Sequence, residues 1–496
     1  MRRIAATLTA AVFTAGCMVG PTYRRPPIAG TPTIKEAPPD GWKNAEPNEG
    51  LPRGRWWEIY NDPQLNDLVS KVELSNQNVI AAMARYREAV DQVQIARAAL
   101  FPTATATPSA IVTKGSTLSS RGQLISGSSG GTSSGTSSGA STGSSRSGSG
   151  VNVNYAMPFD ISYQADIWGN IRRSVTASQD TAQASAADLE NAKLTFQAQL
   201  AQMYFQLHGL DADADLLRRN VAIFEQSLQL TQDRFNAGVA SGADVAQART
   251  QLESARSQLV DVGVGRAQFE HAIAVLIGDT PAMVSIPEQI VDTPPPAIPL
   301  GVPSTLMERR PDVAATERAI AASNEQIGIA KAAYFPALTL GGTGGFVSTN
   351  LAKLFTVPSL FWSVGPQVAA TLFDGGLRKG QVRFSQAAYD ESVATYRQTV
   401  LTAFQQVEDQ LSSLRILEQE QATEAAARQA AQDAVDIAVA QYQAGTADYL
   451  AVIVLQATLL QAQRLEIDIL TRRLTASVLL IEALGGGWDE SQLPSF

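Results

Sequence analysis

The sequence contains one cysteine and two histidines in 496 residues, so it is poor in the side chains that ligate metals or act as nucleophiles. A single cysteine cannot form a disulfide within the chain. His208 and His271 stand apart on segments with helical patterning, where a lone histidine usually has a structural role. The sequence contains no metal-ligand cluster, nucleophile–base set or phosphate loop, so we expect no enzyme and no cofactor.

Positive charge is also scarce. The chain carries 38 Lys and Arg against 47 Asp and Glu, a formal net charge of −9. Nucleic-acid-binding proteins gather Lys and Arg on one surface, so we expect neither DNA nor RNA as a partner. With 45% hydrophobic residues, the chain is long enough for a large core or for several domains.

The N-terminus has the pattern of an export signal. Residues 1–16 place Arg2 and Arg3 before an apolar run that is too short to span a bilayer. Cys17 follows directly and is similar to a bacterial lipobox cysteine, which predicts lipidation there; a buried or free thiol is the alternative. Thr14 departs from the Leu or Val usual in a lipobox, and Met18 replaces the Asp of the inner-membrane retention signal.

One short segment of the sequence occurs twice in similar form. "IARAALFPTATATPS" begins at Ile95, and "IAKAAYFPALTLGGT" begins at Ile329. The residue before a proline is pushed toward extended geometry, and proline is tolerated where a strand starts, so each copy predicts a helix-to-strand junction. We therefore expect two tandem repeats, residues 65–288 and 304–487, joined by a Pro-rich linker at 289–303.

Each repeat is predicted to contain a helix, two strands, a long helix, a tight tip and a returning helix. In the first repeat these are strands at about 103–113 and 151–166, a long helix at 170–237, a tip at 238–243 and a helix at 244–278. In the second they are strands at about 337–347 and 361–373, a long helix at 377–444, a tip at 445–448 and a helix at 449–485. An extended segment at 17–64, anchored by Trp56 and Trp57, and a tail at 488–496 complete the chain.

In the strand predicted at 151–166, apolar residues recur at every second position and most residues between them are polar. At about sixteen residues it exceeds the nine to eleven that a tilted strand needs to cross a bilayer. Pro158 indicates a bulge or a sheet edge. The residues expected to face a barrel lumen are Asn152, Asn154, Asp160, Ser162 and Gln164, with Asp166 next on the same face.

Four membrane-type strands cannot close a barrel by themselves, because open sheet edges are not tolerated in lipid. Single-chain barrels begin at eight strands, so several chains must share one barrel. An exported chain places that barrel in the outer membrane. The proline-free helices of nearly 70 residues would be roughly 100 Å long and would extend into the periplasm.

The two tips carry matching turn signals. Gly238 and Gly445 suit the left-handed position just past a helix end. Ser241 or Asp244 in the first repeat, and Thr446 or Asp448 in the second, can cap the returning helix.

Several motifs in fixed order resemble the outer-membrane factor family of TolC-like efflux ducts, specifically the lipoproteins of RND-type multidrug pumps (the NodT-like branch). They are "CMVGPTYRRP", "WWEIYNDPQLNDLV", the two junctions, "PSTLMERRPDVAATE", "FDGG" and "ALGGGW". The resemblance covers essentially the whole chain. It implies a mixed α and β membrane protein, a homotrimer whose twelve-stranded barrel continues into an α-helical coiled-coil tunnel. It also implies docking on a periplasmic adaptor and an inner-membrane transporter, with passive conduction of drugs or other small toxic compounds.

The same resemblance implies a periplasmic gate at the second tip. Leu450 matches a constriction leucine, whereas Val454 stands where relatives carry aspartate. Tyr442 and Asp448 match positions that hold the closed tip together, so we expect a mainly apolar constriction; packing of Val454 between helices is the alternative. The adaptor-docking residues implied at the tips are Arg234, Phe235, Gly238, Gln441, Tyr442 and Gly445.

Two other functions stay open at this point. A type I protein-secretion duct would share the whole architecture, although the lipobox and NodT-like motifs favour efflux. A non-transport trimeric coiled-coil surface protein usually places its strands at the C-terminus, whereas here they lie inside both repeats. The Ser/Gly-rich run at 126–150 is an exposed loop in each case.

Overall fold

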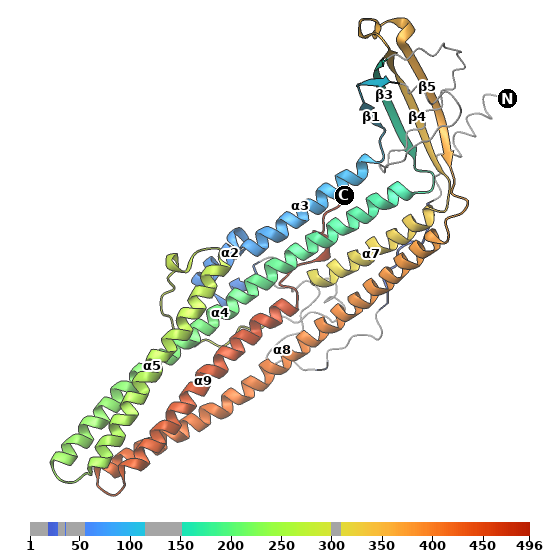
Figure 1. Cartoon of the computed structure of the whole chain (residues 1–496). Coiled ribbons are helices and arrows are strands. Elements are labelled where there is room, and N and C mark those ends of the chain that lie inside the picture. The colour runs from blue at the N-terminus through green and yellow to red at the C-terminus, as the bar shows by residue number, and fades with distance from the viewer. Residues whose placement is uncertain (1–17, 28–34, 36–54, 115–150, 299–308) are drawn as a thin grey trace. The chain divides into compact units, whose positions relative to one another are not determined.

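The computed structural model describes residues 18–27, 35, 55–114, 151–298 and 309–496. The predicted signal peptide, Cys17, most of the 17–64 segment, the Ser/Gly-rich run and part of the linker lie outside the described residues. The chain forms two compact units (Figure 1). The strand unit contains Ile95–Arg173 and Gly328–Gln381 with the described end of Met1–Gly20, and the helical unit contains Pro21–Gln94, Ser174–Ile327 and Val382–Phe496.

The two repeats have the same order of elements (Figure 1). η1 (Trp56–Tyr60) precedes the first repeat, which contains α2 (Pro63–Ser75), α3 (Gln77–Ala98), β1 (Thr103–Ala106), β2 (Ser109–Lys114), β3 (Val151–Ala165), α4 (Asn170–Asn236), α5 (Gly242–Leu276) and η3 (Pro281–Met283). The second repeat contains α7 (Pro311–Ala332), β4 (Ala337–Ser348), η4 (Leu351–Lys353), η5 (Val357–Ser359), β5 (Leu360–Ala369), α8 (Leu377–Gln443) and α9 (Tyr449–Ala483), and η6 (Glu490–Gln492) follows it in the C-terminal tail.

The strand unit is one antiparallel sheet in the order β1-β3-β4-β5, with β2 also pairing with β3. β1 and β2 follow one another along the same edge of β3, so the sheet has four strand positions. The single strand expected at 103–113 is therefore wrong. It breaks at Thr107 and Pro108, opposite Met157 and Pro158 of β3, because a proline has no N–H to donate to the ladder.

The last strand is also shorter than expected. β5 ends at Ala369, not at 373. The next residues form the turn into α8, where the Asp374 carboxylate accepts a hydrogen bond from the Gly376 backbone N–H at 2.9 Å. A short polar side chain that bonds nearby backbone N–H groups favours a turn over continued strand.

The register brings like residues together on each face of the sheet. Asp160, Thr343 and Ser363 are directly paired across β3, β4 and β5 and so share one face. The Thr343 hydroxyl donates a hydrogen bond of 2.6 Å to the Asp160 carboxylate. The apolar face includes the pairs Phe159–Gly344 and Gly344–Trp362. The alternation read from the sequence thus extends over three neighbouring strands.

Position 345 of β4, which pairs with Pro158 of β3, has room only for a glycine. A Cβ added at Gly345 would lie 2.2 Å from the Met157 carbonyl oxygen, far inside van der Waals contact. β3 and β4 therefore approach each other closely only because position 345 has no side chain.

The helical unit is built around two antiparallel hairpins, α4 with α5 and α8 with α9 (Figure 1). α4 and α8 each have 67 residues, which corresponds to roughly 100 Å of helix. α5 begins at Gly242, two residues before the start predicted at 244. The reason is the N-cap: Ser241 accepts from the Asp244 N–H and Asp244 accepts from the Ser241 N–H, a complete capping box.

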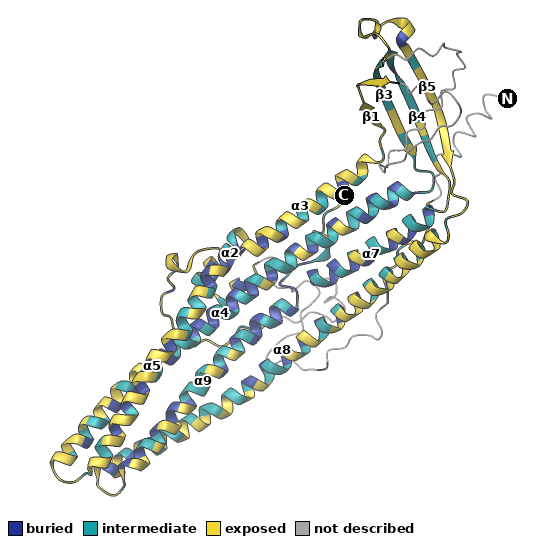
Figure 2. Ribbon diagram, viewed as in Figure 1, coloured by how far each residue is buried: buried dark blue, intermediate teal, exposed yellow. Residues whose placement is uncertain are grey.

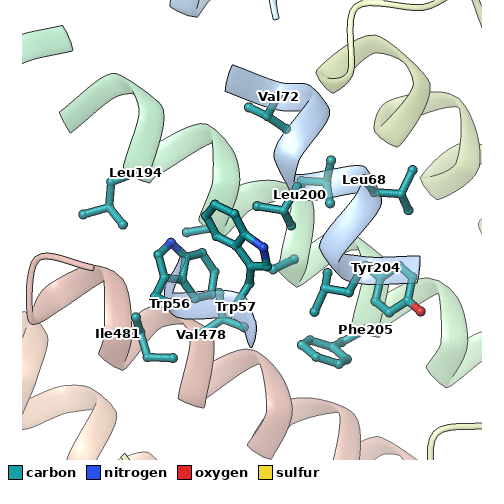
Figure 3. Packing of buried hydrophobic residues seen from close by; sticks show 14 of the residues in the cluster. Trp56, Trp57, Leu68, Val72, Leu194, Leu200, Tyr204, Phe205, Val478 and Ile481 are labelled. Atoms are coloured by element: carbon teal, nitrogen blue, oxygen red, sulfur yellow. The ribbon is translucent and has the colours of Figure 1, made fainter. Parts of the chain in front are cut away.

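The main core of the helical unit surrounds the two neighbouring tryptophans (Figure 3). Trp56 and Trp57 are 1% and 4% exposed, and their rings meet edge to face with centroids 5.7 Å apart. They pack among α2, α4 and α9, in one cluster with Leu194 and Ile481. The predicted anchoring of the N-terminal segment by these side chains is confirmed, because burying two indoles is strongly stabilising.

Candidate gate and docking tips

Both hairpin tips close with the same backbone turn. In the first, the Gly238 N–H bonds the Phe235 carbonyl and the Val239 N–H bonds the Arg234 carbonyl, each at 2.9 Å. In the second, Gly445 and Thr446 bond the carbonyls of Tyr442 and Gln441 at 3.1 and 2.9 Å. This is a Schellman ending, which requires a left-handed residue. Both glycines have φ of +78°, so their predicted turn role is confirmed.

Arg234 links the two tips. Its Nη1 donates a 3.1 Å hydrogen bond to the Gln443 carbonyl oxygen, and its guanidinium carbon lies 4.7 Å from the centroid of the Tyr442 ring. The side chain thus leaves α4 and ends on the last turn of α8. A cation over a tyrosine face together with a hydrogen bond to an unpaired helix-end carbonyl joins hairpin to hairpin.

Tyr442 and Tyr449 fill the space behind this contact. They are 6% and 3% exposed, and their ring centroids lie 5.1 Å apart. Burial raises the pKa of the Tyr449 phenol, and the nearby Thr231 and Ser227 of α4 offset part of that rise. Among the described residues, the Tyr442 hydroxyl has no hydrogen-bond partner. The two rings pack on each other within the second hairpin, and Ala248 of α5, in the same buried cluster, joins them to the first.

The predicted constriction residues lie on the outer face of α9. Leu450 and Val454 are 56% and 55% exposed and stand one helical turn apart, while Tyr449 and Val452 face the core. Val454 does not pack between helices of its own chain. Asp448 occupies the N-cap position, but within the described contacts its side chain makes no cap hydrogen bond, so the predicted cap is absent. Its carboxylate is exposed beside Leu450.

The residues implied for adaptor docking divide into two groups. Phe235 is 47% exposed, and Gln441 is exposed as well. The space where a Cβ of Gly238 would lie is open within the described structure, and at Gly445 the nearest atom is Arg234 Nη2 at 3.8 Å. Figure 2 shows both tips exposed. Arg234 and Tyr442 instead face inward, where they connect the hairpins.

The sequence did not reveal the role of Asp166. It was assigned to the polar strand face, but β3 ends at Ala165 and the carboxylate turns to the start of α4. Its two oxygens accept hydrogen bonds from the Ile171 and Arg172 backbone N–H groups at 3.1 and 2.9 Å. Asp374 does the same before α8, so each repeat uses an aspartate to turn from strand to helix. The available signal was an aspartate a few residues before the start of each long helix, in "QADIWGN" and in "LFDGG".

His208 has a structural partner. Its Nδ1 lies 2.9 Å from the Asp211 carboxylate, which also accepts a 2.6 Å hydrogen bond from Arg266 Nε. Burial alone would raise the Asp211 pKa, but the hydrogen bonds from His208 and Arg266 lower it below its usual value. In the part of the chain that the structure describes, no three His, Cys, Asp or Glu side chains form a metal-binding group.

α9 is the one described helix long and apolar enough, by length and composition, to cross a membrane. It is an arm of the second hairpin and contributes Val478 and Ile481 to the core. Only 22% of its most apolar stretch is buried within the single chain. The exposed large apolar side chains of this helix are Leu450 and Val454.

Comparison with known proteins agrees with this architecture. The family model described as outer membrane efflux protein matches residues 68–279 and 302–486. The chain is 30% identical to the pyoverdine export outer membrane protein OpmQ of Pseudomonas aeruginosa, over 88% of each chain. It is 28% identical to the antibiotic efflux pump outer membrane protein ArpC of Pseudomonas putida, over 96% of this chain and 93% of that one.

A solved structure of the outer-membrane channel OprN superimposes with a TM-score of 0.83 at 26% identity, over 95% of this chain and all of that one. The predicted TolC-like fold, two tandem repeats with long helices and membrane-type strands, is therefore confirmed. The prediction of a channel in place of an enzyme is confirmed by the same family. The chain belongs to the outer membrane efflux protein family and is the outer-membrane channel of a Gram-negative bacterial efflux pump.

Proposed function

We propose that the channel is a homotrimer in which three chains share one twelve-stranded barrel. The observation that carries this proposal is the sheet with four strand positions, bounded on one side by β1 and β2 and on the other by β5. Within the described chain neither edge meets another strand, and open edges are not tolerated in lipid. The exposed Leu450 and Val454 side chains of α9 support the same assembly.

The test is the native mass of the purified full chain in mild detergent, with the detergent contribution subtracted. One chain has a mass of 52.7 kDa. We expect three chains per particle, because three chains with four strand positions each supply the twelve strands of the proposed barrel. A stable monomer would leave the edges unpaired in lipid and would refute the shared barrel.

We further propose that Leu450 and Val454 form the periplasmic constriction, with Tyr442 holding the tip and Asp448 as the charged neighbour. Support comes from the exposure of the first two side chains on one face of α9. In a trimer, three copies of each would meet around the axis. An apolar ring of this kind blocks ions by excluding water.

The remaining assignments follow from the proposed duct. A periplasmic adaptor would dock on the tips and connect the channel to an inner-membrane RND-type transporter. Cys17, once residues 1–16 are removed, would carry the lipid that anchors the chain. The polar sheet face with Asn152, Asn154, Asp160, Ser162 and Gln164 would line the barrel lumen. The relatives that export pyoverdine and antibiotics favour drugs or other small toxic compounds as substrates.

A further inference from the structure

A cavity of about 490 Å³ lies between the two hairpins of the helical unit. It is lined by α4 from the first hairpin and by α8 and α9 from the second. Its size falls within the range of pockets that hold small molecules. Neither the barrel nor the constriction residues Leu450 and Val454 contribute to it.

Two amide side chains give the cavity unsatisfied polar atoms. Gln456 and Gln463 are separated by two turns of α9, and both line the cavity. In the described structure, the Oε1 atoms of both are buried and have no hydrogen-bond partner. Gln456 is only 5% exposed. A buried acceptor without a donor is unfavourable, so a ligand that brings N–H groups would be stabilised here.

The charge of the lining favours a cation. Arg219 and Asp436 are the charged residues among the described lining. Arg219 is paired with Asp215 at 3.2 Å, so its charge is balanced. Asp436 is exposed at the rim and accepts a 3.0 Å hydrogen bond from the neutral amide of Gln432, and no described cation pairs with it. A ligand ammonium near Asp436 would compensate its negative charge.

The rest of the lining is apolar. Phe224, Val435 and Leu459 line the cavity and are 2%, 7% and 8% exposed. Such a wall suits a hydrocarbon or aromatic body. We propose that this cavity is a binding site for an amphipathic organic ammonium ion, with an N–H group on Gln456, its charge near Asp436 and its body against Phe224 and Leu459.

Occupancy of the site would connect the hairpins. Gln443, whose carbonyl accepts the Arg234 hydrogen bond, also lines the cavity. A ligand that contacts α4 and α9 together would hold the two tips in the arrangement described above. Reduced channel opening is therefore expected on binding. That consequence depends on the proposed gate, whereas the binding itself does not.

The test is a fluorescence titration of the purified full chain in detergent with 1-naphthylmethylamine, corrected with a blank of the same micelles. We expect saturable binding of one molecule per chain. The neutral analogue 1-naphthylmethanol has the same aromatic body and should bind about tenfold more weakly, since it lacks the charge. Equal binding of the two compounds, or a signal no larger than that of the blank, would overturn the proposal.

Variants locate the site. Asp436→Asn and Gln456→Leu should each weaken amine binding by about tenfold or more, because each removes one polar contact. Ile223→Trp should also weaken it by filling the cavity from the rim, where Ile223 is 48% exposed. The matched control is Gln429→Leu, an exposed glutamine of α8 outside the cavity. If Asp436→Asn and Ile223→Trp bind as the wild type does, the amine lies elsewhere and the proposal is wrong.

Discussion

Val454 lies one turn after Leu450 on the exposed face of α9, so both positions carry an apolar side chain. We predict that cation block from the side of the tips is weak in the wild-type channel and that Val454→Asp introduces it. Three carboxylates around an axis would attract a trivalent cation, so the half-blocking concentration should fall by about tenfold or more. The measurement is single-channel conductance in a planar bilayer with the cation on the tip side.

Val454→Asn is the control, because it has nearly the shape of aspartate without the charge. It should leave the half-blocking concentration at the wild-type value. Strong block of the wild-type channel would show that another acidic ring, such as one made by Asp448, already closes the entrance. That result would contradict the proposed apolar gate.

At the residue scale, periodicity revealed which side chains share a face but not what each polar one contacts. Asp160 and Asp166 looked equivalent in the alternating strand. The structure pairs the first with Thr343 across the sheet and turns the second onto the first backbone N–H groups of α4. The difference is decided by where β3 ends, and a period of two does not mark an end.

At the element scale, the glycine of each tip has two proposed roles. It forms the left-handed turn, and it leaves a bare backbone on the docking surface. Asparagine tolerates a left-handed backbone far better than other non-glycine residues. We therefore predict that Gly445→Asn and Gly238→Asn keep the fold and the oligomer but reduce efflux, with drug resistance falling by about fourfold or more if a partner must approach the bare backbone. Resistance is measured in cells that express the complete pump, alongside the native mass of each variant.

Gly375→Asn is the matched control for this test. Gly375 also has a left-handed φ, of +62°, with open space within the described structure at its Cβ position, but it lies in the turn before α8, away from the tips. It should retain wild-type resistance. If the tip variants retain it too, their glycines only shape the turn and docking occurs elsewhere.

The long helices and their tips were readable from sequence because proline-free periodicity and glycine ends are local signals. Contacts between distant elements were not. Arg310 of "MERRPDV" donates a 2.9 Å hydrogen bond to the Ala483 carbonyl at the end of α9, and Asn76 donates one of 2.7 Å to Leu276 at the end of α5. An arginine and an asparagine thus do the same task in the two repeats, which no alignment of residue types would indicate.

At the scale of the whole molecule, the repeat and the strand count led to a shared barrel because sheet edges must be paired in lipid. The β1 and β2 split did not change that count, since both occupy one position beside β3. The structure of one chain does not fix the register between its own edge strand and the edge strand of the neighbouring chain. Sequence patterning specifies which face a residue is on, but the stagger between chains is set by barrel closure.

Cross-linking between the two edges tests this closure directly. Thr105 of β1 lies on the same sheet face as Ser363, Gly365 and Gln367 of β5. We predict that Thr105→Cys, combined in turn with Ser363→Cys, Gly365→Cys and Gln367→Cys, gives oxidative cross-links for at least one pair, the pair that the stagger brings within disulfide distance. Denaturing gels should then show one, two and three linked chains and nothing larger, because a closed ring has no free edge. The control variant is Val364→Cys. Residue 364 points to the opposite face of the sheet, so this cysteine should not link to Thr105→Cys. A ladder that continues beyond three chains would indicate an open array and would contradict the closed barrel.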